Sequence, residues 1–259
     1  MKNGYRLAAG ICVILALILL VWYVLPEGEP TISPAPDGSL SGEQGSTGSD
    51  APPEVSAPEV TEDRPADFEQ MRQSNPDVYA WITVPGTVID YPVVQSATDD
   101  SFYLNHDSSK RRSQAGALFT ERAYNSRSFS DPVTVIYGHR LKSGALFGEL
   151  QAFYSDRTRF DRYRTIQIRL PDRELTYEIF AALPYDSRHI LYNYDFTQKR
   201  VYRAFFEDIL SARGVSVNLD AACDLSEQPR ILILSTCLRG DRSQRYLVMA
   251  RQLSSVPTM

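Results

Sequence analysis

Hydrophobic and polar positions along this chain follow three different patterns. Residues 7–25 form an uncharged, mostly apolar run of 19 residues, and residues 26–65 contain no aromatic residue. From residue 66 onward, short apolar runs alternate with turn residues. The chain therefore divides into an apolar segment, a polar segment and a region that can form a core.

The apolar run predicts a membrane-spanning helix, because 19 residues match the thickness of about 30 Å of a bilayer's hydrocarbon core. Lys2 and Arg6 precede the run, whereas Glu27 and Glu29 follow it. Since basic flanks stay in the cytoplasm, we expect a single-pass cell-membrane protein with cytoplasmic residues 1–6 and an extracellular remainder. The alternative is a cleaved secretory signal. The length of the run and the lack of a small-x-small cleavage site favour an uncleaved signal-anchor.

The polar segment, residues 26–65, has the composition of a spacer. It holds eight of the sixteen prolines, nine acidic residues and one basic residue. Too few apolar side chains are present to offset the entropy lost on folding, so we expect a disordered acidic spacer rich in Pro, Ser and Gly. This spacer is more negative than the whole chain, whose net charge is −5. The remainder is nearly neutral, which argues against nucleic-acid binding.

Residues 66–259 are predicted to form the working domain, with one substantial core and mainly β structure. Eight runs, bounded by turn residues, predict strands at residues 81–84, 88–94, 117–120, 133–137, 165–170, 175–183, 231–236 and 246–253. Eight such strands indicate a barrel or a sandwich.

Three segments of this domain predict helices. Residues 67–73 and 146–154 are short, and the first would open the domain. Residues 197–213 show the clearest pattern, since apolar residues recur every four positions from Val201 and Gly214 can end the helix. We expect the apolar side chains of this helix to pack on the core.

Cysteine chemistry is the first candidate for a function. The three cysteines include no CxxC pair and are too few for a disulfide scaffold. Cys237 ends one strand run, and Arg245 begins the next after seven intervening residues. An antiparallel hairpin would place the two opposite each other, and a partly exposed thiol beside a guanidinium favours a nucleophilic thiolate. The alternative is an inert, buried cysteine.

A nucleophilic thiol needs a partner that transfers protons, usually histidine. His139 follows a strand run and a glycine, so its side chain can reach a cleft at a strand end. His106 and His189 lie in polar connecting stretches, which is typical of surface residues. Because the histidines and cysteines are scattered without ligand spacing, a zinc site is a weak rival and we expect no metal and no cofactor.

Several motifs together resemble the sortase family. Two motifs of this chain are similar to the sortase signature: Tyr137-Gly138-His139 and Leu234-Ser235-Thr236-Cys237. The second motif is followed by Arg245 and an apolar run, as in that signature. Residues 75–82, 89–95, 103–107 and 144–148, with the long helix before the cysteine strand, are similar to class B sortases of Gram-positive bacteria in particular. Each motif alone is weak, but their order and spacing are specific, and the resemblance covers nearly all of residues 70–253.

The resemblance implies a closed eight-stranded β-barrel of mixed strands with an N-terminal helical extension, and a monomeric cysteine transpeptidase. By resemblance, Cys237 attacks the carbonyl after the threonine of a C-terminal sorting signal and forms a thioacyl enzyme. His139 would protonate the leaving amine, and Arg245 would hold the oxyanion or the substrate backbone. An amine of peptidoglycan or of its lipid-linked precursor would then accept the exported protein, which becomes fixed to the cell wall.

The resemblance also implies a substrate cleft, with some departures. Positions that line the class B cleft are matched by Leu104, Tyr137 and Ser235. Class B members often carry an acid directly after the cysteine, where this chain has Leu238, so no carboxylate is given a catalytic role. Asp100 stands where a cleft asparagine often occurs. Arg239 and Arg242 are rival guanidiniums, and the apolar run that follows Arg245 favours Arg245.

The enzymatic prediction depends on a free thiol at Cys237 that converges with His139 and Arg245 on one groove. Cys223 lies 14 positions before Cys237 in the chain. A disulfide between them would consume the nucleophile, so we predict that Cys223 is a reduced structural residue.

Other functions remain open from the sequence. A pilus-polymerising sortase would use a pilin lysine as the acceptor. An L,D-transpeptidase is a second alternative, because residues 235–239 are superficially similar to the cysteine motif of that family, although the glycine before the cysteine is missing. An anchored binding module with an inert cysteine is a third.

Overall fold

The computed structural model describes residues 64–258. The predicted cytoplasmic segment, the predicted membrane helix and nearly all of the predicted spacer lie outside these residues. Within residues 64–258, no helix combines the length and the apolar character needed to cross a membrane.

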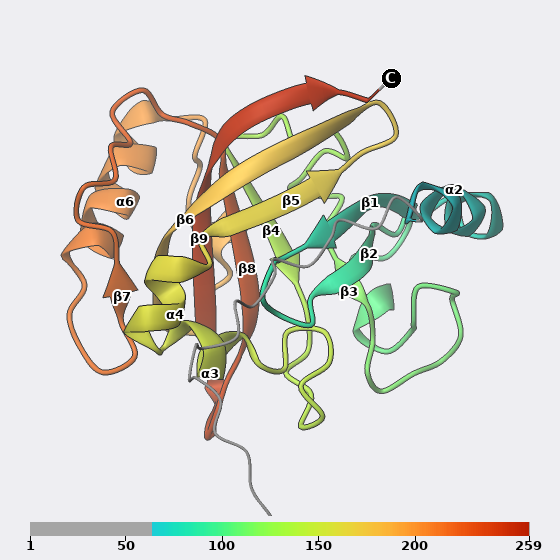
Figure 1. The fold of residues 1–259 in the computed structure, drawn as a ribbon, viewed down its shortest axis with the longest axis horizontal. Helices are drawn as coiled ribbons and strands as arrows, with labels where there is room; N and C mark the ends of the chain where they lie inside the picture. The colour runs from blue at the N-terminus through green and yellow to red at the C-terminus, as the bar shows by residue number, and fades with distance from the viewer. Residues whose placement is uncertain (1–63, 259) are drawn as a thin grey trace, which may run out of the picture. The chain divides into compact units, whose positions relative to one another are not determined.

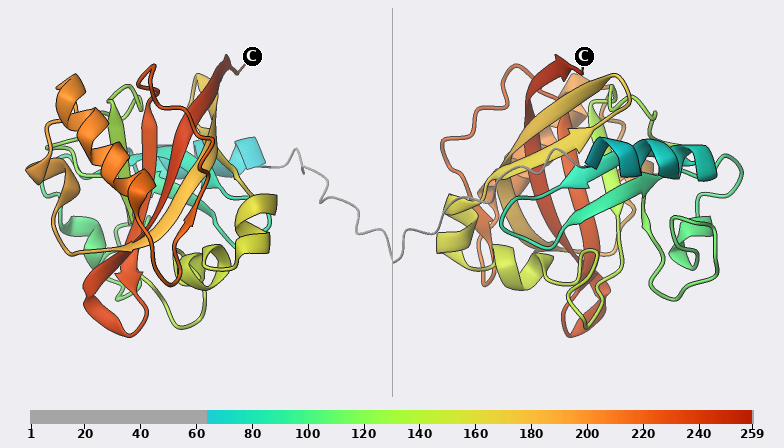
Figure 2. Two further views of the ribbon diagram at one scale, coloured as in Figure 1. Left: turned by 90° about the vertical axis from the view of Figure 1, so that its left-hand side faces the viewer. Right: turned by 45° about the vertical axis from the view of Figure 1, so that its right-hand side comes forward.

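Eight strands pair into a closed barrel (Figures 1 and 2). In order around the barrel they are β5 (Thr165–Arg169), β1 (Val78–Thr83), β2 (Asp90–Val94), β3 (Leu118–Phe119), β4 (Val133–Tyr137), β8 (Ile231–Leu238), β9 (Asp241–Pro257) and β6 (Arg173–Tyr185). β6 pairs back with β5 and closes the ring. The pairs β2–β3 and β4–β8 are parallel, and the other pairs are antiparallel. The predicted closed, mixed eight-stranded barrel is confirmed.

Strand bounds differ from the prediction where pairing outweighs local composition. β4 has the predicted bounds, but β9 begins five residues before the predicted start at 246 and ends four residues after the predicted end at 253. Its polar ends are extended because they pair with β8 and β6. A two-residue strand, β7 (Asn218–Leu219), joins the edge of β6 and was not predicted, since two residues carry no periodic signal.

Helices lie outside the barrel (Figure 1). The extension α2 (Arg64–Ser74) begins three residues before the predicted start, and α6 (Lys199–Ser211) is the long helix before the cysteine strand. In place of one helix at residues 146–154 there are turns followed by α3 (Leu150–Tyr154) and α4 (Arg157–Arg162), because Leu146 has a left-handed φ of +54°. The sequence patterns did not predict the short elements α5 (Ile190–Asn193) and η1 (Phe102–Leu104).

Two of the three hydrophobic cores of the described residues share the central strands. One core receives side chains from all eight barrel strands, among them Leu234, and fills the barrel. The other lies between the barrel and the aromatic face of α6, and it includes Ile233. Because side chains alternate along a strand, Ser235 and Cys237 continue the outer series of Ile233. The barrel's outer face is therefore apolar beneath α6 and polar where the cysteine lies.

Candidate active site

Every site residue singled out from the sequence lines one cavity of about 330 Å³. These residues are Leu104, Tyr137, His139, Ser235, Cys237 and Arg245. Asp100, Ser101, Phe119, Glu121, Gly138 and Thr236 complete the lining. The structure therefore brings together segments that lie up to 145 positions apart in the chain, from Asp100 to Arg245.

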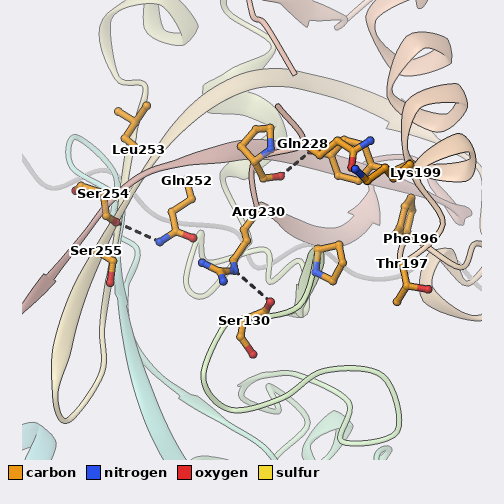
Figure 3. Close-up of a pocket in the computed structure, with 13 residues that line it drawn as sticks. Ser130, Phe196, Thr197, Lys199, Gln228, Arg230, Gln252, Leu253, Ser254 and Ser255 are labelled. Atoms are coloured by element: carbon orange, nitrogen blue, oxygen red, sulfur yellow. Dashed lines mark hydrogen bonds between the residues drawn. The ribbon is translucent and has the colours of Figure 1, made fainter. Parts of the chain in front are cut away.

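A larger cavity of about 520 Å³ lies between the start of α6 and the distal part of β9 (Figure 3). Its lining includes Lys199, Arg230 and Gln252. None of its lining residues is a cysteine or a histidine. The smaller cavity, which holds both residue types, is therefore the candidate active site.

Parallel pairing of β4 and β8 brings the histidine and the cysteine together. Tyr137 of β4 is in register with Ser235 of β8, and the N–H of Gly138 donates to the Ser235 carbonyl oxygen at 3.1 Å. Cys237 lies two residues further along β8, and His139 lies two residues beyond the end of β4. Since neighbouring strands lie about 4.8 Å apart, this register brings the ends of β4 and β8 to one cavity, which His139 and Cys237 both line.

Cys237 sits at the mouth of the predicted β8–β9 hairpin. It is half-buried, and it is directly paired with Arg245 of β9. A guanidinium nitrogen of Arg245, Nη1, lies 4.0 Å from the Sγ atom of Cys237. The hairpin is tighter than predicted: Leu238 already pairs with Asp241, so the intervening residues of β9 form a bulge.

The alternative guanidinium Arg239 and the second thiol, Cys223, do not line the cavity that holds Cys237. Arg239 is exposed, does not line the cavity, and uses its backbone N–H to bond Gln151. The side chain of Arg242 lies outside the described part of the structure.

Cys223 and Cys237 are both free thiols, and Cys223 is buried in the core beneath α6. Burial raises the pKa of Cys223 to about 11, so this thiol is a poor nucleophile at neutral pH.

His139 is held by the backbone of η1. Its Nε2 atom lies 2.8 Å from the carbonyl oxygen of Leu104. A carbonyl oxygen can only accept, so Nε2 must donate and carries a proton. The Nδ1 atom is therefore the ring nitrogen left to exchange protons with a substrate.

Gly116 closes the space beneath this hydrogen bond, a role that the sequence patterns did not reveal. Its φ is +63°, and a Cβ atom placed there would lie 3.0 Å from the Leu104 carbonyl oxygen and 3.1 Å from Cδ2 of His139. A Cβ would also lie 2.6 Å from the carbonyl oxygen of Tyr103. A single glycine between two predicted segments carries no pattern, so tertiary contact is the signal that identifies it.

The predicted cleft residues present different groups to the cavity. Leu104 is 44% exposed, whereas Ser235 is 5% exposed. The hydroxyl of Tyr137 is buried without a hydrogen-bond partner of normal geometry, and burial raises its pKa. Asp100 uses its carboxylate to accept the N–H groups of Arg122 at 2.6 Å and Ala123 at 3.2 Å, so it organises the loop after β3.

His106 and His189 are each partly exposed. His106 stacks on Phe102 with ring centroids 3.9 Å apart. His189 lies next to the cavity wall, where its Nε2 bonds the carboxylate of Glu121 at 2.7 Å. Within residues 64–258, no three potential metal-ligating side chains cluster.

Comparison with known proteins places this geometry in a family. A family profile described as the sortase domain matches residues 82–253. The chain belongs to the sortase family. This sortase is 27% identical over 171 residues to sortase B of Listeria monocytogenes, which covers 66% of this chain and 67% of that protein. The family decides against the L,D-transpeptidase interpretation.

Solved structures show the same relationship. The crystal structure of sortase B from Clostridium perfringens is 28% identical and has a TM-score of 0.63, covering 72% of this chain and 99% of that chain. A class B sortase of Streptococcus pyogenes, described as involved in pilus biogenesis, is 25% identical with a TM-score of 0.61, covering 73% and 99%. This sortase is a sortase B-like cysteine transpeptidase.

Proposed function

We propose that this sortase cleaves the C-terminal sorting signals of exported proteins after threonine and transfers each protein to an amine of peptidoglycan or of its lipid-linked precursor. The observation that carries the proposal is the cavity in which the Cys237 thiol lies 4.0 Å from the Arg245 guanidinium and which His139 also lines. The resemblance to class B sortases suggests that the signal is an Asn-Pro-x-Thr-type or related pentapeptide.

The first half-reaction forms a thioester. The thiolate of Cys237 attacks the threonine carbonyl carbon, and the negative charge that develops on the carbonyl oxygen is stabilised by the Arg245 guanidinium. The Nδ1 atom of His139 donates its proton to the leaving amine, so the C–N bond breaks and leaves a thioacyl group on Cys237. The hydrogen bond from Nε2 to Leu104 keeps the imidazole ring oriented during this transfer.

The second half-reaction releases the thiol. The acceptor amine attacks the thioester carbonyl, and neutral His139 takes up the proton that the amine loses. The C–S bond then breaks, Cys237 leaves as a thiolate, and a new amide bond joins the exported protein to its acceptor. Dividing the amide exchange into two steps lowers each barrier.

Trapping the intermediate tests this function. The full-length protein in detergent is incubated with synthetic sorting peptides, and mass spectrometry locates the acyl adduct. We expect an adduct on Cys237 that disappears when an amine acceptor is added, and no adduct in Cys237→Ala. Peptide turnover that survives Cys237→Ala would exclude the proposal.

The location of the reaction is part of the proposal. Residues 7–25 would anchor the protein in the cell membrane, with the catalytic domain outside, which suits a reaction between exported proteins and the wall. We expect membrane association to be lost when residues 1–25 are deleted, and externally added protease to digest the catalytic domain on intact, wall-stripped cells. A soluble full-length chain, or a protected domain, would contradict the anchor.

Pilus assembly is the second candidate, because the Streptococcus pyogenes relative is described as involved in pilus biogenesis. The two functions differ in the acceptor. Competition between a peptidoglycan stem-peptide amine and a lysine-bearing pilin peptide for the thioacyl enzyme would separate them.

A further inference from the structure

An unassigned carboxylate stands in the wall of the catalytic cavity. Glu121 follows β3 by two residues and lines the cavity together with Cys237 and Arg245. Its side chain is 17% exposed. A carboxylate that is mostly withdrawn from water needs hydrogen-bond donors, and those donors reveal what the group is prepared to bind.

His189 supplies one donor without supplying a charge. The Nδ1 atom of His189 accepts the backbone N–H of Tyr192 at 3.1 Å at the start of α5, so this nitrogen keeps its lone pair. The proton of the neutral ring is then on Nε2, which donates to Oε2 of Glu121 at 2.7 Å. The imidazole therefore orients the Glu121 carboxylate and leaves its negative charge in place.

The backbone around Glu121 is also held. The carboxylate of Asp100 accepts the N–H groups of the two residues that follow Glu121, at 2.6 and 3.2 Å. The ring of His189 is in turn packed between Tyr124 and Tyr137, with centroid distances of 4.8 and 6.1 Å. A carboxylate that is fixed from both sides is preorganised to bind a ligand with little loss of entropy.

The Glu121 carboxylate can accept further hydrogen bonds besides the one from His189. A carboxylate has about four lone-pair sites that can accept hydrogen bonds. Among the described residues, His189 donates a hydrogen bond of normal geometry to the Glu121 carboxylate. The hydroxyl of Tyr137, which lines the same cavity, is buried without a partner of normal geometry. After burial, the charge and a hydrogen bond of Glu121 help to raise the pKa of Tyr137, so this hydroxyl faces the Glu121 carboxylate. It can occupy one acceptor site of the carboxylate and leaves the others for a ligand.

We propose that Glu121 is a specificity-determining residue that accepts a hydrogen bond from an N–H-bearing side chain of the sorting signal, either a carboxamide or an ammonium group. The inference rests on the proposed function. The signal is the occupant because it must lie across Cys237 and Arg245 before the acceptor enters. Glu121 also excludes carboxylate side chains, since two like charges would face each other in a partly dehydrated cavity.

Peptide selectivity of the full-length protein tests the assignment. In a parent sorting peptide that the protein cleaves, each position before the scissile bond is replaced in turn by Asn, Gln, Lys, Leu or Asp. We expect one position at which N–H-bearing side chains exceed Asp in kcat/KM by about 10- to 100-fold, the range for a hydrogen bond to a charged group. Comparing kcat/KM for the Asn and Gln peptides with kcat/KM for the Lys peptide at that position shows whether Glu121 binds a carboxamide or an ammonium group.

Substitution of Glu121 then assigns this preference to a residue. In Glu121→Gln the preference at that position falls at least tenfold, mainly through KM, and Asp becomes tolerated. The exposed Glu207→Gln on α6 is the matched control and leaves the preference unchanged. His189→Gln retains an N–H donor toward Glu121 and keeps more of the preference than His189→Leu does, as expected for a positioning residue.

The outcomes separate this inference from the function on which it rests. Cleavage with the same side-chain preference in Glu121→Gln as in the unaltered protein overturns the role of Glu121 alone. Failure of the unaltered protein to cleave any sorting peptide overturns the proposed function and this inference with it. Thermal unfolding of each variant shows whether a lost preference arises from misfolding, and Glu121→Asp, which keeps the charge, partly restores the preference.

Discussion

Cys237 and Arg245 are directly paired residues of an antiparallel hairpin, and Nη1 of Arg245 lies 4.0 Å from Sγ of Cys237. The strand pairing holds the two Cα atoms at the spacing of a ladder pair, so their side chains share one face. The guanidinium can therefore stabilise both the thiolate before attack and the oxyanion that forms next to it. The first prediction follows from this pairing.

Replacing Arg245 is expected to lower activity in a graded way. Arg245→Ala removes the donors to the developing oxyanion and should reduce kcat/KM by about 10²- to 10³-fold. Arg245→Lys keeps the charge but not the planar fork of donors, so it should retain intermediate activity. Cleavage of a fluorogenic sorting peptide measures both, with Arg239→Ala as the control in the same hairpin. Equal activity in Arg245→Ala and the unaltered protein would remove Arg245 from the mechanism.

The imidazole of His139 is expected to carry its proton on Nε2 when neutral. The cause is the 2.8 Å hydrogen bond to the Leu104 carbonyl oxygen, which only accepts. Nitrogen-15 NMR of histidine-labelled protein distinguishes a protonated from an unprotonated ring nitrogen, and His139→Gln identifies the signal. A neutral ring protonated on Nδ1 would contradict the proposed orientation.

Gly116→Ala is expected to impair catalysis and also to lower stability, because the new Cβ would lie 2.6 Å from the Tyr103 carbonyl oxygen. The new methyl group would crowd the Leu104 carbonyl oxygen and the His139 ring, both of which lie within 3.1 Å of the position that Cβ would occupy. Displacing the ring should lower kcat by about tenfold or more, since misplacing a catalytic group by 1 Å can cost 10²-fold.

Gly144→Ala is the matched control for this substitution. Gly144 also has a left-handed backbone, with a φ of +87°, but nothing lies within 4 Å of its Cβ position. The two variants therefore share the backbone strain of an alanine at positive φ and differ in crowding. A similar loss of kcat in both would show that backbone strain, and not the contact with His139, is responsible.

Cys223 is expected to react slowly with iodoacetamide at pH 8. Its pKa is raised to about 11 by burial, so the thiolate fraction at pH 8 is on the order of 10⁻³. Because the thiolate is the reactive form, its labelling rate should rise about tenfold per pH unit until the pH approaches 11. Peptide mapping by mass spectrometry separates Cys223 from Cys237, and Cys237→Ala shows whether the two rates are independent. Rapid labelling of Cys223 at pH 8 would mean that this thiol is accessible.

Much of the barrel follows from local patterns in the sequence. The run at residues 133–137 has the bounds of β4, and the apolar repeat from Val201 lies within α6. These elements are long enough, and periodic enough, for side-chain alternation to identify them. The two-residue β7 and the four-residue α5 carry no such signal, because they form only where neighbouring strands and loops hold them.

Some residues of the candidate site could be identified from the sequence, and others only from the structure. Residue types and their spacing made Cys237, His139 and Arg245 candidates, because a thiol nucleophile needs a proton carrier and a cation, and the resemblance to sortase motifs favoured them over the alternatives. Glu121 and Gly116 were not found, since an acid after a short strand and a glycine in a loop are common in sequences. Their positions on the cavity wall and beneath the His139 ring depend on segments that pairing brings together.

The sequence by itself determined the centres of the eight barrel strands and which residue types can supply thiol chemistry, because periodicity and side-chain chemistry are local properties. The tertiary structure decided that β4 lies parallel to β8, with Tyr137 in register with Ser235. That register turns two distant strand ends into one cavity. Register is a property of paired backbones, set by how a whole barrel closes, and no single segment contains it.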